Sequence, residues 1–295
     1  MAPKESLSSL IKQASLGDIG ALARSLTFIE RDLKGSLPQI AKLKASKKSL
    51  RIGITGPPGA GKSTLVNLLI KNYRKDDYKI GVLAVDPSSP FSGGALLGDR
   101  IRMNEHSADS NVFIRSIGSR GGVGGLSAAS GAMARVLEYC GFDLILIETV
   151  GVGQTELEIM NLAHATAVIL VPESGDVIQT LKAGILEIAD VFIVNKSDRV
   201  GADILAQELK NLVEQESKTP RNVFLTSANR DEGIVPLAKH LLELALKFKN
   251  NSKRVQVRNL GQLRALVLAS WDQELQKKIS KLKIQDPFIT FSKFK

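Results

Sequence analysis

Residues 51–64 have the sequence RIGITGPPGAGKST, and the order of features in this segment indicates the fold class. A segment of strand length, residues 51–55, leads into a glycine-rich turn, and a helical pattern begins at Lys62. The pattern G-x-x-x-x-G-K-[ST] between a strand and a helix is a P-loop, whose backbone N–H groups and helix N-terminus bind phosphate oxygens. The stretch therefore predicts a nucleotide-phosphate site made of Gly56, Pro57, Pro58, Gly59, Ala60, Gly61, Lys62, Ser63 and Thr64.

Two side chains of this loop carry specific chemistry. A lysine at the position of Lys62 contacts the β and γ phosphates and stabilises the charge that develops during phosphoryl transfer. The hydroxyl of the next residue, Ser63, is a ligand for Mg²⁺. We therefore expect a magnesium-dependent nucleoside triphosphatase.

Outward from the loop, apolar segments of strand length alternate with helical stretches. Leu144–Ile147 is a continuous aliphatic run, which is typical of a parallel strand buried on both faces. The alternation predicts an α/β fold with a mostly parallel central sheet flanked by helices. The expected strands are residues 51–55, 79–85, 111–115, 143–149, 166–171, 190–194 and 222–225.

Helical patterns flank this central region on both sides. Residues 5–46 predict three short amphipathic helices, broken at Gly17 and at Gly35–Pro38. Near the other end, apolar residues recur at helical spacing from Leu260 to Leu282 and form one stripe that must pack somewhere. We expect an N-terminal helical segment (1–48), a nucleotide-binding domain (49–249) and a C-terminal helical arm (250–295).

A P-loop also needs a carboxylate at the end of a neighbouring strand to hold the metal or its water shell. Glu148 ends an apolar strand, and Gly151 follows three residues later, where its N–H could contact the γ-phosphate. Asp86 directly follows the apolar segment 80–85, and Asp99 lies in the next loop. The candidate metal ligands are therefore Ser63, Asp86, Asp99 and Glu148.

The choice of base is indicated by Asn195-Lys196-Ser197-Asp198, which follows another apolar strand and fits the N-K-x-D element. A carboxylate at Asp198 can accept hydrogen bonds from the ring N–H and the amino group of guanine together, whereas adenine has no such donor pair. Further along the chain, Ser227-Ala228-Asn229 follows a strand, and the Ala228 N–H could donate to guanine O6. The expected nucleotides are GTP and GDP.

Composition and charge exclude several other classes. With 43% hydrophobic and 24% charged residues, the chain is neither disordered nor a coiled-coil rod. The net charge of +10 comes from the two flanks, which have few aromatic residues for base stacking, so polynucleotide binding is not expected. The absence of a long apolar run predicts no membrane partner. A lone cysteine, Cys140, and the lack of a signal-like N-terminus favour the cytoplasm.

Taken together, these segments resemble the MeaB/ArgK family of P-loop GTPases, which are G-protein chaperones for adenosylcobalamin-dependent acyl-CoA mutases. The resemblance covers roughly residues 5–285. It is carried by the blocks Gly53–Thr64, Val85–Pro90, Gly94–Met103 and Glu148–Gln154.

The resemblance implies several properties that the residues alone do not establish. Ser63, Asp86, Asp99 and Glu148 correspond to the family's magnesium and switching residues, with Glu148 as the Walker B acid. Lys182 lies in what the family uses as a mobile loop that responds to the mutase. The partners implied are a B12-dependent acyl-CoA mutase and a second copy of the chain, bound through the C-terminal arm.

Hydrolysis without a partner is expected to be slow. Val152 stands after Gly151, where Ras-like enzymes place a glutamine that orients the attacking water. Gln154 and Lys182 are candidate contributors to catalysis, alongside Lys62 and Glu148.

Two other functions remain open at this level. One is an ATP-dependent kinase or ATPase of an amino-acid transport system, which the carboxylate of Asp198 disfavours. The other is a metal-insertion GTPase. Such proteins usually carry histidine-rich tracts or clustered cysteines, whereas His106, His164 and His240 are far apart in this sequence.

Overall fold

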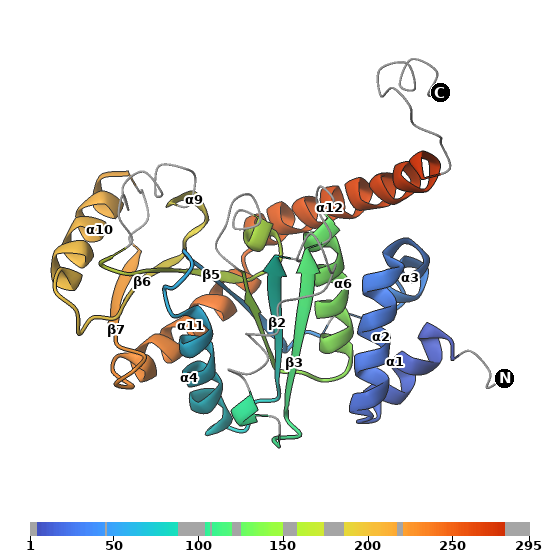
Figure 1. Ribbon diagram of the computed structural model, residues 1–295, viewed down its shortest axis with the longest axis horizontal. Helices are drawn as coiled ribbons and strands as arrows, with labels where there is room; N and C mark the ends of the chain where they lie inside the picture. Colours follow the sequence, from blue (N-terminus) through green and yellow to red (C-terminus); the bar gives the residue numbers. More distant parts are fainter. Residues whose placement is uncertain are drawn as a thin grey trace, which may run out of the picture.

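The structure is a computed structural model, and it describes residues 5–44, 46–87, 104–106, 108–119, 125–149, 158–173, 186–216 and 221–280. Its centre is a seven-stranded sheet in which every paired strand is parallel (Figure 1). The strands are β1 Leu50–Thr55, β2 Ile80–Pro87, β3 Val112–Ser119, β4 Leu144–Glu148, β5 Ala165–Leu170, β6 Val191–Asn195 and β7 Asn222–Thr226. The α/β fold with seven strands is therefore confirmed. The third strand runs four residues beyond its expected end.

The strand order is β3-β2-β4-β1-β5-β6-β7, so β1 lies at the centre. The register places Ile54 of β1 opposite Glu148 of β4, and Asn195 of β6 opposite Thr226 of β7. Because all strands are parallel, their carboxyl ends meet at one edge of the sheet. Ligands of open α/β sheets bind at this edge, where the chain connections diverge to opposite sides.

Helices cover both faces of the sheet (Figure 1). Helices α4 (Lys62–Arg74) and α11 (Ile234–Lys249) share an apolar core with one face. Helices α6 (Gly125–Tyr139) and α10 (Ala202–Glu216) contribute to the core on the other face. Shorter helical turns are η1 (Asn104–His106), η2 (Ile159–Asn161) and α9 (Leu186–Ile188).

The N-terminal segment forms the three expected helices, α1 (Leu7–Ser15), α2 (Ile19–Arg31) and α3 (Leu33–Ile40). The expected break at Gly35–Pro38 is wrong, since α3 continues through it. The break is at Asp32, which ends α2 and caps α3 by accepting a hydrogen bond from Gly35 N at 3.1 Å. The Asp32 side chain satisfies a backbone N–H of the first turn of α3, which places the start of that helix here. Helices α2 and α3 pack against α6, and α1 packs against α2 and α3.

The last described helix, α12 (Ser252–Ile279), begins where the Asn251 side chain accepts a hydrogen bond from Arg254 N. In Figure 1 it extends along one side of the molecule and projects beyond α6. Ala265 and Ala269 are buried, whereas Leu260 and Trp271 are 67% and 66% exposed. Part of the apolar stripe is therefore uncovered in the single chain. None of the helices in the described ranges has both the length and the apolar character required to cross a membrane.

Candidate functional site

A cavity of about 380 Å³ lies at the carboxyl edge of the sheet. The loop between β1 and α4 forms one side, and the ends of β2, β4, β6 and β7 contribute the rest. The fold therefore brings together residues from positions 58 to 229. The lining residues are Pro58, Gly59, Gly61, Lys62, Ser63, Thr64, Ala84, Val85, Glu148, Thr149, Asn195, Lys196, Asp198, Ser227, Ala228 and Asn229.

The Lys62 side chain forms hydrogen bonds within the P-loop. Its Nζ donates hydrogen bonds to the backbone oxygens of Gly56 at 2.8 Å and Pro57 at 2.9 Å, and the residue is buried. Gly61, the residue before α4, has a left-handed backbone with φ of 82°. A side chain on it would meet the Asn195 amide nitrogen at 2.5 Å. The loop is thus held against β6 at a distance that requires glycine.

Gly56→Ala is expected to lower the free energy of unfolding by about 2–4 kcal/mol, since strain and overpacking add at this position. Gly56 has φ of 148°, and an added Cβ would lie 2.1 Å from the Ile169 carbonyl oxygen. The matched control is Gly59→Ala, which has φ of 75° but no neighbouring atom within 4 Å and should cost only about 1 kcal/mol. Denaturant unfolding of both variants measures the difference. Equal costs would contradict the close approach of the loop to β5.

Ser63 and Glu148 meet at the floor of the cavity. The Ser63 hydroxyl donates to Glu148 Oε1 at 2.7 Å, and both residues are buried. Two threonines that the sequence analysis did not single out lie beside them, with Thr149 Oγ1 donating to Thr55 Oγ1 at 2.6 Å. Both threonines stand at the carboxyl end of a strand, which is the signal that could have identified them. This arrangement gathers hydroxyl and carboxylate oxygens next to the phosphate loop.

Asn195 connects the loops at the far side of the cavity. Its amide nitrogen donates to Ala60 O of the P-loop at 2.8 Å. Its amide oxygen accepts from Thr226 Oγ1 at 3.1 Å and from Ala228 N at 3.2 Å. The Ala228 N–H, which we expected to face guanine O6, is therefore already hydrogen-bonded to the protein. Asn195 ties β6 to both the P-loop and the β7 loop.

Asp198 is exposed at the mouth of the cavity, and its Oδ1 accepts a hydrogen bond from Ser227 Oγ at 2.6 Å. This hydrogen bond lowers the pKa of the Asp198 carboxyl below its ordinary value. The group is therefore ionised at neutral pH and can accept hydrogen bonds from a ligand. Lys196 beside it has a left-handed backbone, with φ of 57°.

The remaining predicted site residues are only partly described. Asp86 lies near the carboxyl end of β2, where its backbone pairs with Gly118 of β3, and its side chain is not described. Asp99, Gly151, Gln154 and Lys182 lie outside the described residues. Their roles stay predictions.

The family described as "Methylmalonyl Co-A mutase-associated GTPase MeaB" matches residues 22–282. The chain belongs to the MeaB family. It is therefore a P-loop GTPase, and this agrees with the cavity geometry above. The matched residues include most of α2, all of α3, the sheet and α12.

Curated relatives support the same assignment. A Pyrococcus abyssi protein named "Putative GTPase" is 46% identical over 238 residues, which are 78% of this chain and 74% of that protein. GTPase ArgK of Escherichia coli is 35% identical over 67% of this chain and 61% of its own length. The mouse "Methylmalonic aciduria type A homolog, mitochondrial" is 39% identical over 64% of this chain and 47% of its own length. The chain thus spans only part of these relatives.

Solved structures confirm the fold. The structure named "LAO/AO transport system kinase" has a TM-score of 0.72 and 23% identity, covering 95% of this chain and 88% of that one. A nickel complex of HypB from Helicobacter pylori has a TM-score of 0.52 and 18% identity, covering 77% of this chain and 98% of that one. At these identities the similarity shows the fold alone.

Proposed function

We propose that the chain is a GTP-binding and GTP-hydrolysing chaperone that assists an adenosylcobalamin-dependent acyl-CoA mutase, of the methylmalonyl-CoA mutase type, in cofactor loading and protection. The description of its family and the name of its mouse relative support this partner. The cytoplasm stays the expected location. The transport-kinase and metal-insertion alternatives are supported only by structures of low identity, so neither is proposed.

One observation carries the nucleotide part of the proposal. The P-loop, Glu148 and Asp198 line a single cavity, with the buried lysine at one side and the exposed carboxylate at the other. A nucleotide lying along this cavity would place its phosphates on the P-loop amides and its base against Asp198. Lys196 and the 227–229 loop would enclose the base, with Asn195 holding the two loops together.

Hydrolysis then depends on groups that stabilise the negative charge of the transition state. Lys62 and the backbone N–H groups of the P-loop stabilise charge on the phosphate oxygens as the bond to the leaving group breaks. To do so, Lys62 must exchange its hydrogen bonds to Gly56 and Pro57 for phosphate oxygens. Gln154 and Lys182 are proposed to complete the site when the mutase binds.

The oxygen atoms at the cavity floor are suitable ligands for a magnesium ion. Mg²⁺ prefers hard oxygen ligands, and the Ser63 hydroxyl and the Glu148 carboxylate supply such oxygens 2.7 Å apart. Asp86 and Asp99 are the further proposed ligands or holders of its water shell. When bound, the ion would neutralise charge on the triphosphate.

Glu148→Gln should lower magnesium-dependent GTP turnover about 10–100-fold, the usual cost of altering a group that supports a bound metal. The amide oxygen can still accept the Ser63 hydrogen bond, so folding should be retained. Turnover measured across a magnesium titration tests this. The control is Asp143→Asn at the opposite end of β4, where Asp143 Oδ2 accepts a hydrogen bond from Lys79 N. An unchanged magnesium dependence in Glu148→Gln would remove the metal role.

Nucleotide state is proposed to reach the mutase through residues 86–102, 148–154 and 176–182, because loops that contact the γ-phosphate change order on hydrolysis. Homodimerisation through the 250–295 arm is proposed as well. The uncovered apolar residues of α12 support it, including Leu260 and Leu275. We also propose that the chain is divided into an N-terminal helical segment (1–48), a GTPase domain (49–249) and a C-terminal arm (250–295).

GTP turnover with and without the B12-dependent mutase from the same cell tests the partner. We expect the mutase to raise GTP turnover and to leave ATP turnover at background. If the mutase has no effect while slow GTP turnover persists, the chaperone role is wrong and the GTPase assignment stands. Turnover of ATP in place of GTP would overturn the guanine assignment.

A further inference from the structure

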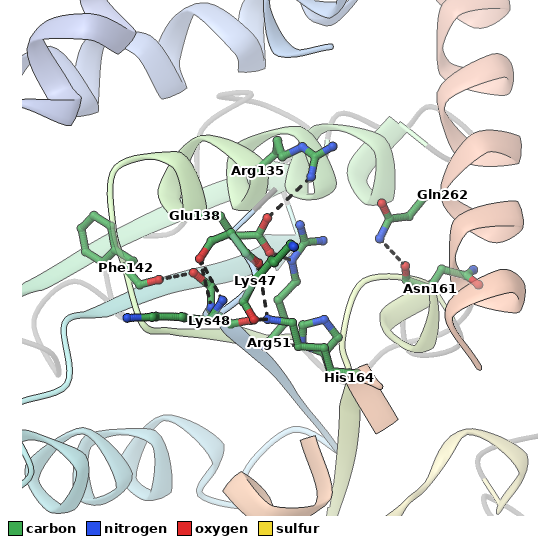
Figure 2. Close-up of polar contacts among 12 residues, drawn as sticks. Lys47, Lys48, Arg51, Arg135, Glu138, Phe142, Asn161, His164 and Gln262 are labelled. Atoms are coloured by element: carbon green, nitrogen blue, oxygen red, sulfur yellow. Dashed lines mark hydrogen bonds and ion pairs between the residues drawn. The ribbon is translucent and has the colours of Figure 1, made fainter. Parts of the chain in front are cut away.

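A second cavity, of about 840 Å³, lies at the opposite edge of the sheet from the P-loop. Arg51, near the start of β1, and His164, directly before β5, contribute from the amino ends of the strands. Helices α3, α6 and α12 supply the walls. Figure 2 labels five of its lining residues, with Arg135 and Glu138 on α6, Gln262 on α12, and Arg51 and His164 near the strand ends. Its described lining residues are all different from those of the nucleotide site.

The charges in this cavity do not balance. Among its described lining residues, Arg51, Arg135, Lys249 and Arg258 are basic, and Glu138 is the single carboxylate. Arg51 and Glu138 are buried and pair through Arg51 Nε and Glu138 Oε1 at 2.7 Å. The Lys249 amino group donates to backbone oxygens of Lys47 and Ser49.

Two arginines are left over after this pairing. Arg135 reaches the second oxygen of Glu138 only at 4.0 Å, and that oxygen accepts no hydrogen bond within the described part of the chain. Arg258 is half-buried, and in the described ranges it makes no hydrogen bond or ion pair. Both guanidinium groups line the cavity with donors still available, an arrangement suited to carboxylate or phosphate oxygens.

The neighbouring His164 is uncharged at neutral pH. His164 Nδ1 accepts a hydrogen bond from Arg51 N at 2.8 Å. Burial first, and then the positive charge of Arg258, lower the pKa of His164 to about 2. Burial followed by repulsion from Arg51 lowers the pKa of Arg258 to about 10, which leaves it charged at neutral pH. The Glu138 carboxylate attracts Arg258 but is already paired with Arg51, so the half-buried guanidinium of Arg258 stays costly and a bound anion would relieve that cost.

Much of the remaining wall is apolar. Leu37 and Ile40 come from α3, and Leu266, Val267 and Trp271 come from α12. Trp271 is the chain's single tryptophan. A pocket of this size with mainly apolar walls and a few polar groups is typical of a small-molecule site.

We propose that this cavity binds a small amphipathic organic anion, whose single carboxylate or phosphate head contacts Arg258 and Arg135 and whose apolar body lies against α3 and the Trp271 side of α12. The cavity is separate from the nucleotide site, so its occupation does not require GTP chemistry. Whether the head group is a carboxylate or a phosphate, the ligand has one anionic group attached to an apolar body.

Trp271 emission offers a local readout on the full-length protein. We expect octanoate or octyl phosphate to shift the emission to shorter wavelength and to saturate, and the tighter of the two identifies the head group. Octanol and inorganic phosphate should bind at least about tenfold weaker, because each lacks one half of the recognition. Equal affinity for octanol and octanoate would overturn the proposal, as would a failure of both anions to bind.

Matched variants locate the binding. Arg258→Gln should weaken octanoate or octyl phosphate binding at least about tenfold, as expected for loss of a charge-assisted hydrogen bond. Arg264→Gln, an exposed arginine on the same helix outside the cavity, should not change it. Arg135→Gln tests the same head-group contact at a less buried position and keeps the test valid if Arg258→Gln unfolds. Unchanged affinity in both cavity variants would overturn the site.

Two further measurements separate this site from its alternatives. Binding should survive in Lys62→Ala, since the anion does not use the P-loop; its loss there would place the anion at the nucleotide site and overturn the proposal. The affinity should also be independent of protein concentration. Binding that weakens as the protein concentration rises would show that a second copy of the chain occupies the cavity instead.

Discussion

Lys62→Ala is expected to lose tight GTP binding, with affinity falling about 100–1000-fold. The lysine is buried at the base of the P-loop, with its amino group 2.8 Å from Gly56 O and 2.9 Å from Pro57 O. When a triphosphate binds, this group is proposed to contact two phosphates, and each charge-assisted hydrogen bond contributes about 1.5–3 kcal/mol. A fluorescent GTP analogue titrated against wild type and variant measures the loss.

The matched control is Lys71→Ala on the same helix, α4. Lys71 is exposed and pairs with Glu105 on the surface, so its removal should leave nucleotide affinity unchanged. Thermal unfolding of both variants separates lost contacts from lost folding. Unchanged affinity in a folded Lys62→Ala protein would contradict the assignment of the phosphate site.

Asp198→Asn is expected to shift base preference from guanine to xanthine nucleotides. The carboxylate is ionised, exposed at the cavity mouth and oriented by Ser227 Oγ at 2.6 Å. The N–H₂ group of an asparagine at this position would face the amino group of guanine, and two donors cannot form a hydrogen bond. Xanthine has a carbonyl oxygen in place of that amino group, and this oxygen can accept a hydrogen bond from the asparagine N–H₂. GTP affinity should fall about 100-fold or more, since unpaired polar groups at a specific site carry a large penalty. Competition between GTP and XTP measures the change.

Asp203→Asn is the control for this substitution, because Asp203 is exposed in the first turn of α10 and does not line the cavity. Its base preference should match that of the wild type. If Asp198→Asn keeps full preference for GTP, the carboxylate does not select the base. The guanine assignment would then have to rest on the family alone.

Much of the fold is predictable because the signal is local. A buried parallel strand such as Leu144–Glu148 is a continuous apolar run, and the P-loop has a fixed spacing between a strand and a helix. The parallel arrangement then brings strand ends together, so residues at those ends converge. Lys62, Glu148 and Asp198 were identifiable for this reason, and the structure brings them to one cavity.

Other features depend on side-chain contacts that have no sequence pattern. The boundary between α2 and α3 lies at Asp32 because a carboxylate caps the helix there, although Gly35 and Pro38 give the stronger local signal. The hydrogen bond of Ala228 N to Asn195 depends on the packing of two loops that are distant in sequence.

The second cavity could not be predicted for a related reason. Arg51 and Glu138 are 87 residues apart, and Arg258 comes from a helix near the other end of the chain. Each is an ordinary charged residue in its own segment. Only the packing of α6 and α12 beside the amino ends of the strands gives these charges a common position.

One guanine nucleotide is expected to lie along the carboxyl edge of the sheet, and a crystal structure with a non-hydrolysable GTP analogue and Mg²⁺ would reveal its position. We predict density for the phosphates on residues 56–64, for the metal at Ser63 and for the base beside Asp198. A nucleotide bound elsewhere, or one whose base lies away from Asp198, would contradict this placement.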